Sequence, residues 1–116
     1  MIWTVDYYTT RGDRQPVAEW RDGLDRRFRV VIDAKIQKLG EYGLELLSTE
    51  MLKIISGDDS DFYELRGGQC RIATYYDRPR ATFVLLHGWL KKKRRQKQDI
   101  KQARRLLHEY LSAEGG

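Results

Sequence analysis

Hydrophobic and polar residues follow two different spacings along this chain, and the spacings separate predicted strands from predicted helices. Ile2–Tyr8 (IWTVDYY) is rich in β-branched and aromatic residues, which is typical of a strand. Pro16 opens a short helix, because the first helical position does not need the N–H that proline lacks. Apolar residues then recur every three or four positions through Arg26–Tyr42, which predicts a longer helix. We expect the two helices to form a hairpin that packs on a sheet.

The second half of the chain predicts strands followed by one more helix. The strand-like segments are Met51–Ile55, Phe62–Arg66, Gln69–Asp77 and Ala81–Trp89. Gly67 and Gly68 lie between two of these segments and predict a hairpin turn. Gln96–Ser112 carries an apolar stripe at helical spacing and predicts a closing helix.

This order predicts an α+β fold in one small domain over residues 1–116. We expect an antiparallel sheet with the N-terminal helical hairpin packed on one face, together with a C-terminal helix. In Gln69–Asp77, alternation places Arg71, Ala73 and Tyr75 on one face of the sheet. We expect the helices to lie mostly on the other face, which leaves the Arg71 face open to solvent.

The stretch Ala81–Lys97 combines an apolar run, a histidine and a basic cluster. The run Phe83–Leu86 suits a buried central strand, and His87 follows it directly. Six of the seven residues in Lys91–Lys97 are basic. The polar groups lie where a core strand reaches the protein surface, and the strand holds them rigidly. The basic cluster indicates a polyanionic ligand, and the histidine indicates proton transfer.

Charge and cysteine content narrow the possible functions. The formal net charge of +5 over 116 residues fits RNA, DNA, an anionic membrane surface or an acidic protein as partner. Cys70 is the only cysteine, which excludes an internal disulfide, and with two histidines it gives too few ligands for a zinc site. We therefore expect no metal and no cofactor. Apolar segments are short and no signal peptide begins the sequence, so we expect a cytoplasmic protein without a membrane partner.

Several motifs, in order, resemble the RelE/ParE toxin superfamily, and most closely its HigB-like, phage-derived branch. The motifs are FYELR, CRIATYY, LLHGWLKKK and DIKQAR. The resemblance implies a toxin of a type II toxin–antitoxin system. Many such toxins cleave messenger RNA on the translating ribosome without a metal, whereas the ParE side of the superfamily poisons DNA gyrase. It also implies a cognate antitoxin, which we expect to be a helix-turn-helix protein encoded next to this chain.

Metal-free RNA cleavage requires a base for the 2′-hydroxyl, cations for the phosphoryl oxygens and an acid for the departing 5′-oxygen. Arg71 and Arg66 are the candidate phosphate-binding groups, because a guanidinium grips two oxygens at once. His87 is the candidate acid or base. Lys91 and Lys92 match paired lysines of the family and are candidates for proton transfer or charge stabilisation.

Each candidate also has a purely structural interpretation. Arg71 could form a surface ion pair with Glu64 or Asp77, and Arg66 could pair with Glu64 or an acidic loop residue. His87 could bond to the backbone at a strand end. Further candidates for RNA contact are Lys53, Tyr75, Lys93, Arg94 and Arg95. Tyr75 could stack on a base, although packing is the commoner role of such a tyrosine.

These observations favour a metal-independent, ribosome-dependent mRNA endonuclease toxin that inhibits translation, with mRNA, the ribosome and the antitoxin as partners. One alternative is a ParE-like gyrase inhibitor, which would need no phosphate-activating residues. The other is a non-catalytic basic protein that binds nucleic acid through the last helix and the lysine-rich cluster.

Overall fold

The computed structural model describes every residue except 1–2, 58–59, 93–95 and 116. Its sheet contains β1 (Thr4–Tyr7), β2 (Leu52–Ile55), β3 (Phe62–Gly67), β4 (Cys70–Asp77) and β5 (Thr82–Leu90). The strand order is β1-β5-β4-β3-β2; β1 runs parallel to β5 and the other neighbours pair antiparallel. The helices are α1 (Pro16–Asp22), α2 (Arg26–Tyr42) and α3 (Gln96–Gly115), with a short 3-10 helix over Gly43–Ser48.

The predicted α+β fold is confirmed, and most element bounds agree within two residues. The Arg26–Tyr42 helix and the start of the last helix at Gln96 are as predicted. The first strand begins at Thr4, and Ile2 lies outside the described residues. The segment directly after α2, for which no element was predicted, forms the 3-10 helix. None of the described helices is long and apolar enough to cross a membrane.

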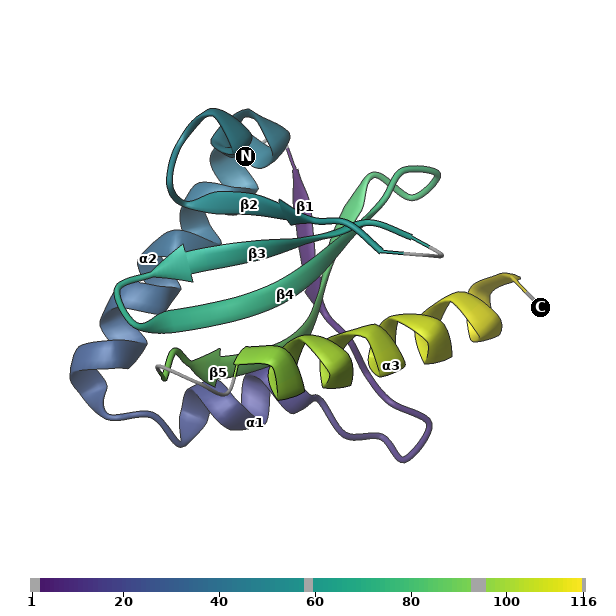
Figure 1. Cartoon of the computed structure of the whole chain (residues 1–116), viewed down its shortest axis with the longest axis horizontal. Helices are drawn as coiled ribbons and strands as arrows, with labels where there is room; N and C mark the ends of the chain where they lie inside the picture. Colours follow the sequence, from purple (N-terminus) through teal and green to yellow (C-terminus); the bar gives the residue numbers. More distant parts are fainter. Residues whose placement is uncertain (1–2, 58–59, 93–95, 116) are drawn as a thin grey trace.

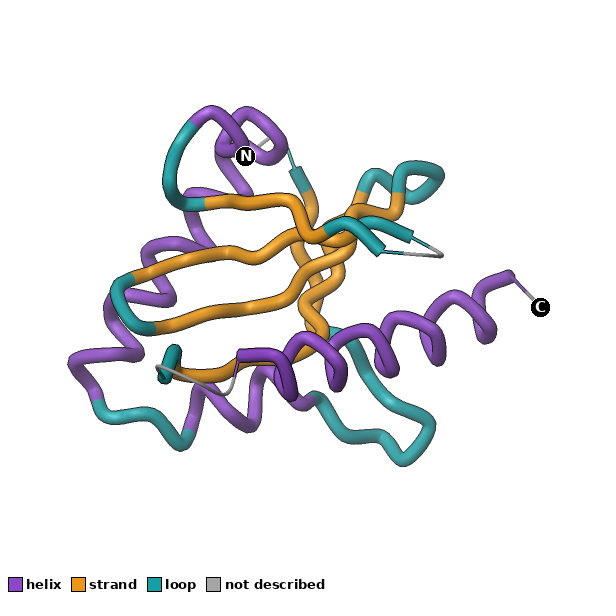
Figure 2. Tube along the Cα trace, in the orientation of Figure 1, coloured by secondary structure: helices purple, strands orange, loops and turns teal. Residues whose placement is uncertain are grey.

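Helices cover both faces of the sheet, so the prediction of an open Arg71 face is wrong. On one face, α1 and α2 bury residues such as Val17, Ile32 and Leu39 against the sheet. On the other face, α3 buries Ala103 and Leu107. Figure 1 shows α3 crossing one side of the sheet while α2 lies on the opposite side, and Figure 2 shows the strands between these helices. The sequence pattern identified the apolar stripe of α3 but not the face it covers.

A β-bulge in β5 changes which side chains point toward α3. Ala73 of β4 pairs with His87, but the next residue, Thr74, pairs with Leu85, so Leu86 is an extra residue in β5. Leu86 belongs to the core beneath α3. The His87 ring stacks on Trp89, which lies in the same core. The bulge therefore turns two consecutive side chains toward α3, as bulges near functional sites often do.

The β3–β4 hairpin turns one residue later than predicted. Gly67 pairs with Cys70 inside the ladder, and the turn consists of Gly68 and Gln69. Gly68 has a φ of +56°, which favours glycine. At Gly67 a Cβ atom would lie 2.8 Å from the Lys35 side chain, so this glycine allows α2 to approach β3 closely.

Candidate functional site

Cross-strand pairing gathers the predicted site residues into two adjacent rows on the face under α3. Residues paired directly across antiparallel strands point to the same side of the sheet. The first row consists of Lys53, Glu64, Ala73 and His87. The second row consists of Arg66, Arg71 and Trp89. Ala73 and Trp89 pack in the core beneath α3, which fixes the side of the sheet on which both rows lie.

Glu64 is the centre of this cluster. Its side chain is buried, with the residue only 1% exposed. Arg66 Nε donates a hydrogen bond of 2.6 Å to Glu64 Oε1, and Gln96 Nε2 donates one of 3.0 Å to Oε2. Arg71 Nε lies 3.5 Å from Glu64 Oε1. One carboxylate thus holds two arginines of neighbouring strands close together and ties them to the first turn of α3.

Arg71 is a buried residue rather than an exposed one. It is 7% exposed, and its Nη1 donates to the carbonyl oxygens of Gly68, at 2.7 Å, and Cys70, at 2.9 Å. Burial lowers the pKa of its guanidinium, and Glu64 opposes that shift. The predicted alternative of an ion pair with Glu64 is confirmed, but the pair is buried under α3 and does not lie on the surface.

Two buried donors in the second row have no hydrogen-bond acceptor within the described part of the chain. They are Arg71 Nε and Trp89 Nε1. The 3.5 Å separation between Arg71 Nε and Glu64 is within ion-pair range but does not make an aligned hydrogen bond. Buried donors are normally satisfied, so this row retains hydrogen-bonding capacity for a further acceptor.

Arg66 is the accessible arginine of the cluster. Its side chain is 32% exposed, compared with 9% for Arg71. Besides its bond to Glu64, it lies 4.0 Å from Glu50, whose side chain is 89% exposed. The ion pair predicted between Arg66 and Glu64 is therefore present, and it leaves part of the guanidinium at the surface.

His87 pairs with a carboxylate of α3, and within the described residues it makes no hydrogen bond to the backbone. His87 Nε2 lies 2.9 Å from Asp99 Oδ1, and the imidazole stacks on Trp89 with a centroid distance of 5.5 Å and an interplanar angle of 22°. The side chain is 20% exposed. Sequence reasoning missed Asp99, because only the position of α3 shows that this residue lies opposite the β5 bulge.

The lysines lie at the rim of the cluster. Lys53 is 40% exposed at its side chain and lies 3.5 Å from Glu50. Lys91 and Lys92 follow β5 and are exposed. Lys92 lines a surface pocket together with Trp89 and Asp99, next to the His87 contact. Lys93, Arg94 and Arg95 lie outside the described residues.

Tyr75 lies away from this cluster. It pairs with Val84, on the far side of the bulge from His87, and its ring packs 6.1 Å from that of Tyr110. The packing role is therefore confirmed. At the same end of the sheet, burial raises the pKa of the Tyr110 phenol to about 12, and a hydrogen bond to Asp77 adds to the shift.

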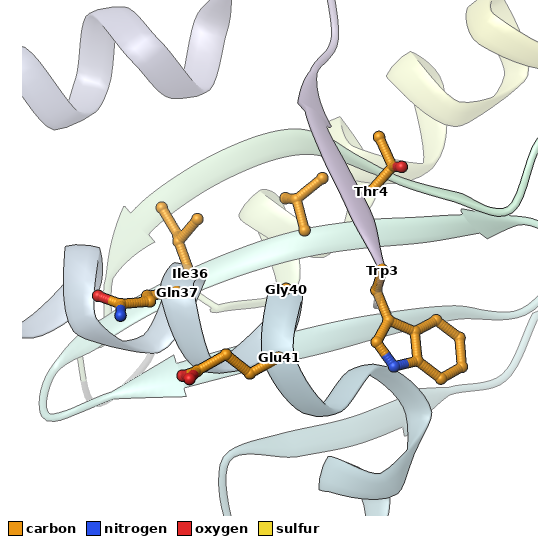
Figure 3. A pocket seen from close by; sticks show the side chains of 7 residues that line it. Trp3, Thr4, Ile36, Gln37, Gly40 and Glu41 are labelled. Atoms are coloured by element: carbon orange, nitrogen blue, oxygen red, sulfur yellow. The ribbon is translucent and has the colours of Figure 1, made fainter. Parts of the chain in front are cut away.

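A separate hollow of about 650 Å³ lies between β1 and α2. Figure 3 shows several of its lining residues, among them Trp3, Ile36 and Glu41. It contains one carboxylate and no cation among its lining residues, so it offers little for binding or cleaving a phosphodiester. Within the described residues, no group of three or more His, Cys, Asp or Glu side chains is arranged to hold a metal ion.

Solved structures that share this fold include the following two. A chain of the toxin–antitoxin complex RelBE2 from Mycobacterium tuberculosis matches 78% of this chain and 100% of its own length, with 18% identity and a TM-score of 0.55. A chain of the archaeal RelE–RelB complex from Pyrococcus horikoshii OT3 matches 80% of this chain and 99% of its own length, with 14% identity and a TM-score of 0.61. The chain therefore has a RelE-like fold. No protein-family model and no curated protein matches the sequence.

Proposed function

We propose that this protein is a type II toxin that cleaves messenger RNA on the translating ribosome without a metal, and so inhibits translation. The observation that carries the proposal is the cluster under the first turn of α3. On a RelE-like fold, it places Arg66, Arg71 and His87 on one face of the sheet. Lys91 and Lys92 lie exposed at its rim. These are the residue types that phosphodiester cleavage by an internal hydroxyl requires.

In the proposed reaction, the His87 imidazole removes the proton of a ribose 2′-hydroxyl. The resulting oxygen attacks the adjacent phosphorus, and the bond from phosphorus to the 5′-oxygen breaks. The Lys92 ammonium gives a proton to that departing oxygen. The products are a 2′,3′-cyclic phosphate and a 5′-hydroxyl. The reaction needs neither an oxidant nor a water molecule.

The two arginines have different roles in the proposed reaction, because their side chains differ in solvent exposure. Arg66, with a side chain 32% exposed, contacts the phosphoryl oxygens in the proposed complex. Arg71, with a side chain 9% exposed, supplies positive charge from beneath and holds Glu64. Charge that develops on the phosphoryl group is stabilised strongly at a partly buried site, because little water screens it. Lys53 and Lys91 add attraction for the RNA backbone at the rim.

The proposed partner in the cell is an antitoxin, which we expect to be a helix-turn-helix protein encoded next to this one. Support comes from the two structural neighbours, which are described as a toxin–antitoxin complex and a RelE–RelB complex. On this chain, exposed Lys97 and Lys101 of α3 suit an acidic segment of such a partner. Co-expression with the adjacent gene should give a complex that survives gel filtration. A harmless protein that binds no product of a neighbouring gene would contradict the assignment as a toxin.

Induction in growing cells tests cleavage itself. Wild-type protein should arrest growth, and primer extension should reveal new 5′ ends in a translated reporter mRNA. A reporter that differs only in lacking its start codon should stay intact, because we propose that the ribosome presents the substrate. His87→Ala, with a melting temperature close to that of the wild type, should do neither. Growth arrest with intact mRNA and loss of DNA supercoiling would instead identify a gyrase inhibitor.

A further inference from the structure

The contacts of His87 with Asp99 and Trp89 constrain the orientation of its imidazole ring. Asp99 lies in the first turn of α3, and its Oδ1 is 2.9 Å from His87 Nε2. Both side chains are mostly buried, with 20% of His87 and 28% of Asp99 exposed. Trp89 stacks against the ring. The imidazole is therefore held at one edge by the carboxylate and on one face by the indole.

This contact specifies which ring nitrogen is available for proton transfer. An ionised carboxylate can only accept hydrogen bonds. A neutral imidazole that bonds to it must donate from Nε2, and its lone pair then lies on Nδ1. A base acts through its lone pair, so the nitrogen directed away from Asp99 is the one that can remove a proton.

We propose that Asp99 is a positioning residue: it holds the His87 ring in the tautomer and orientation in which Nδ1 is the base. The catalytic part of this inference rests on the proposed RNA cleavage, whereas the tautomer and orientation do not. The β5 bulge also contributes to the position of the ring, because it turns His87 toward α3. A strand and a helix that are separate in the sequence thus build one proton-transfer group.

A simpler role for Asp99 must be distinguished from this one. An acidic residue in the first turn of a helix stabilises the helix through its negative charge, whatever it contacts. Aspartate and asparagine separate the two roles. Asp99→Asn loses the charge but keeps an oxygen that can accept from Nε2, whereas Asp99→Ala loses both. A charge role predicts equal effects of the two variants, and a positioning role predicts that the asparagine variant retains more activity.

Other charged residues share this face of the sheet or follow β5, and they are unchanged in these variants. The sheet contributes Lys53, Glu64 and Arg71 from the two rows. The segment after β5 contributes Lys91 and Lys92. On the opposite face of β5, α1 packs Trp20 against Gly88. The variants at Asp99 therefore change one neighbour of the ring while the remaining electrostatic environment is preserved.

The first measurement needs no substrate. Long-range proton–nitrogen correlation NMR on the full chain, at a pH where the imidazole is neutral, should show His87 with a protonated Nε2 and an unprotonated Nδ1. The Nε2 proton should exchange slowly with water in the wild type and rapidly in Asp99→Ala. His108 is the internal reference, and Gln98→Ala, which changes an exposed residue of the same turn, is the matched control. A wild-type ring protonated on Nδ1, or an exchange rate unchanged in Asp99→Ala, overturns the proposal.

The second measurement is the cleavage of ribosome-bound mRNA by the same proteins. Asp99→Ala should lower kcat by about 100-fold with little change in KM, because a misplaced catalytic group costs about that factor. Asp99→Asn should retain part of the lost activity, and Gln98→Ala should match the wild type. Wild-type kcat in Asp99→Ala, or equal losses in the alanine and asparagine variants, overturns the positioning role. If the wild type itself cleaves no mRNA, the proposed function fails, and the NMR result alone decides whether Asp99 positions the ring.

Discussion

Removal of the Glu64 carboxylate should destabilise the protein far more than removal of an exposed carboxylate beside the same arginine. Arg71 is 7% exposed in the wild type, and in Glu64→Ala it loses its anionic partner. Truncation of one partner of a buried ion pair typically costs about 3–5 kcal/mol. Arg71 keeps its two bonds to the carbonyl oxygens of Gly68 and Cys70, which favours the lower end of that range.

The contribution of Arg66 to this loss is small, because its side chain is 32% exposed and water replaces much of the lost interaction. We therefore expect a decrease of about 3 kcal/mol in the free energy of unfolding. For a chain of this size, about 4 °C of melting temperature corresponds to each kcal/mol, so the melting temperature should fall by about 12 °C.

Urea unfolding followed by circular dichroism measures this difference. Glu50→Ala is the matched control, since Glu50 lies near Arg66 and Lys53 but its side chain is 89% exposed. That variant should stay within about 0.5 kcal/mol of the wild type. Glu64→Gln keeps the size of the side chain and its hydrogen-bonding oxygen, so it should lie between the two. If the free energies of unfolding of Glu64→Ala and Glu50→Ala differ by less than about 1 kcal/mol, Glu64 does not organise the cluster.

Three further predictions concern the two arginines, Tyr110 and Gly88. Arg66→Ala should lower the rate at saturating substrate by about 100- to 1000-fold. Its melting temperature should fall less than that of Arg71→Ala, because buried Glu64 loses the bond from Arg66 but keeps Arg71 and Gln96 as partners. The wild-type free energy of unfolding should fall as the pH rises from 10 to 12, because the folded state keeps Tyr110 protonated up to a pKa of about 12. Urea titrations across this pH range should show a smaller fall for Tyr110→Phe. Gly88→Ala should cost about 1–3 kcal/mol, since its Cβ would lie 2.3 Å from the Trp20 ring.

Controls make these three results decisive. An Arg66→Ala protein that cleaves at the wild-type rate would remove this residue from the site. Equal pH dependence in the wild type and Tyr110→Phe would contradict the raised pKa of the phenol. For Gly88, the control is Gly12→Ala, because a Cβ at Gly12 would lie 3.9 Å from its nearest neighbour. Equal stability of the two alanine variants would show that α1 does not pack on β5 as described.

The elements of the fold could be predicted because each follows a local spacing. Apolar residues recur at helical spacing in Arg26–Tyr42, and residues alternate between two faces in Gln69–Asp77. Each pattern can be recognised within its own segment, without knowledge of the rest of the chain. The face covered by α3 is not local information. Arg71, Ala73 and Tyr75 resemble a solvent face when only β4 is considered, but in the fold Ala73 and Tyr75 pack in the core beneath α3.

Only those parts of the site that local sequence motifs mark could be predicted. Arg66, Arg71 and His87 were identified from sequence motifs, and strand register brings them together. The β5 bulge was hidden, because the run Phe83–Leu86 is continuously apolar and shows no alternation that a bulge would interrupt. Glu64 and Asp99 were missed as organising residues because burial and partner, not residue type, distinguish them from other carboxylates.

The chemistry of the RNA ends tests the central proposal most directly. Purified protein should be mixed with purified ribosomes that are translating an mRNA labelled at its 5′ end, and the fragments should be analysed for their terminal groups. A hydroxyl-driven, metal-free reaction predicts an upstream fragment ending in a 2′,3′-cyclic phosphate or 3′-phosphate and a downstream fragment beginning with a 5′-hydroxyl, both absent with His87→Ala. Intact mRNA, or fragments with 3′-hydroxyl and 5′-phosphate ends, would contradict the proposed reaction.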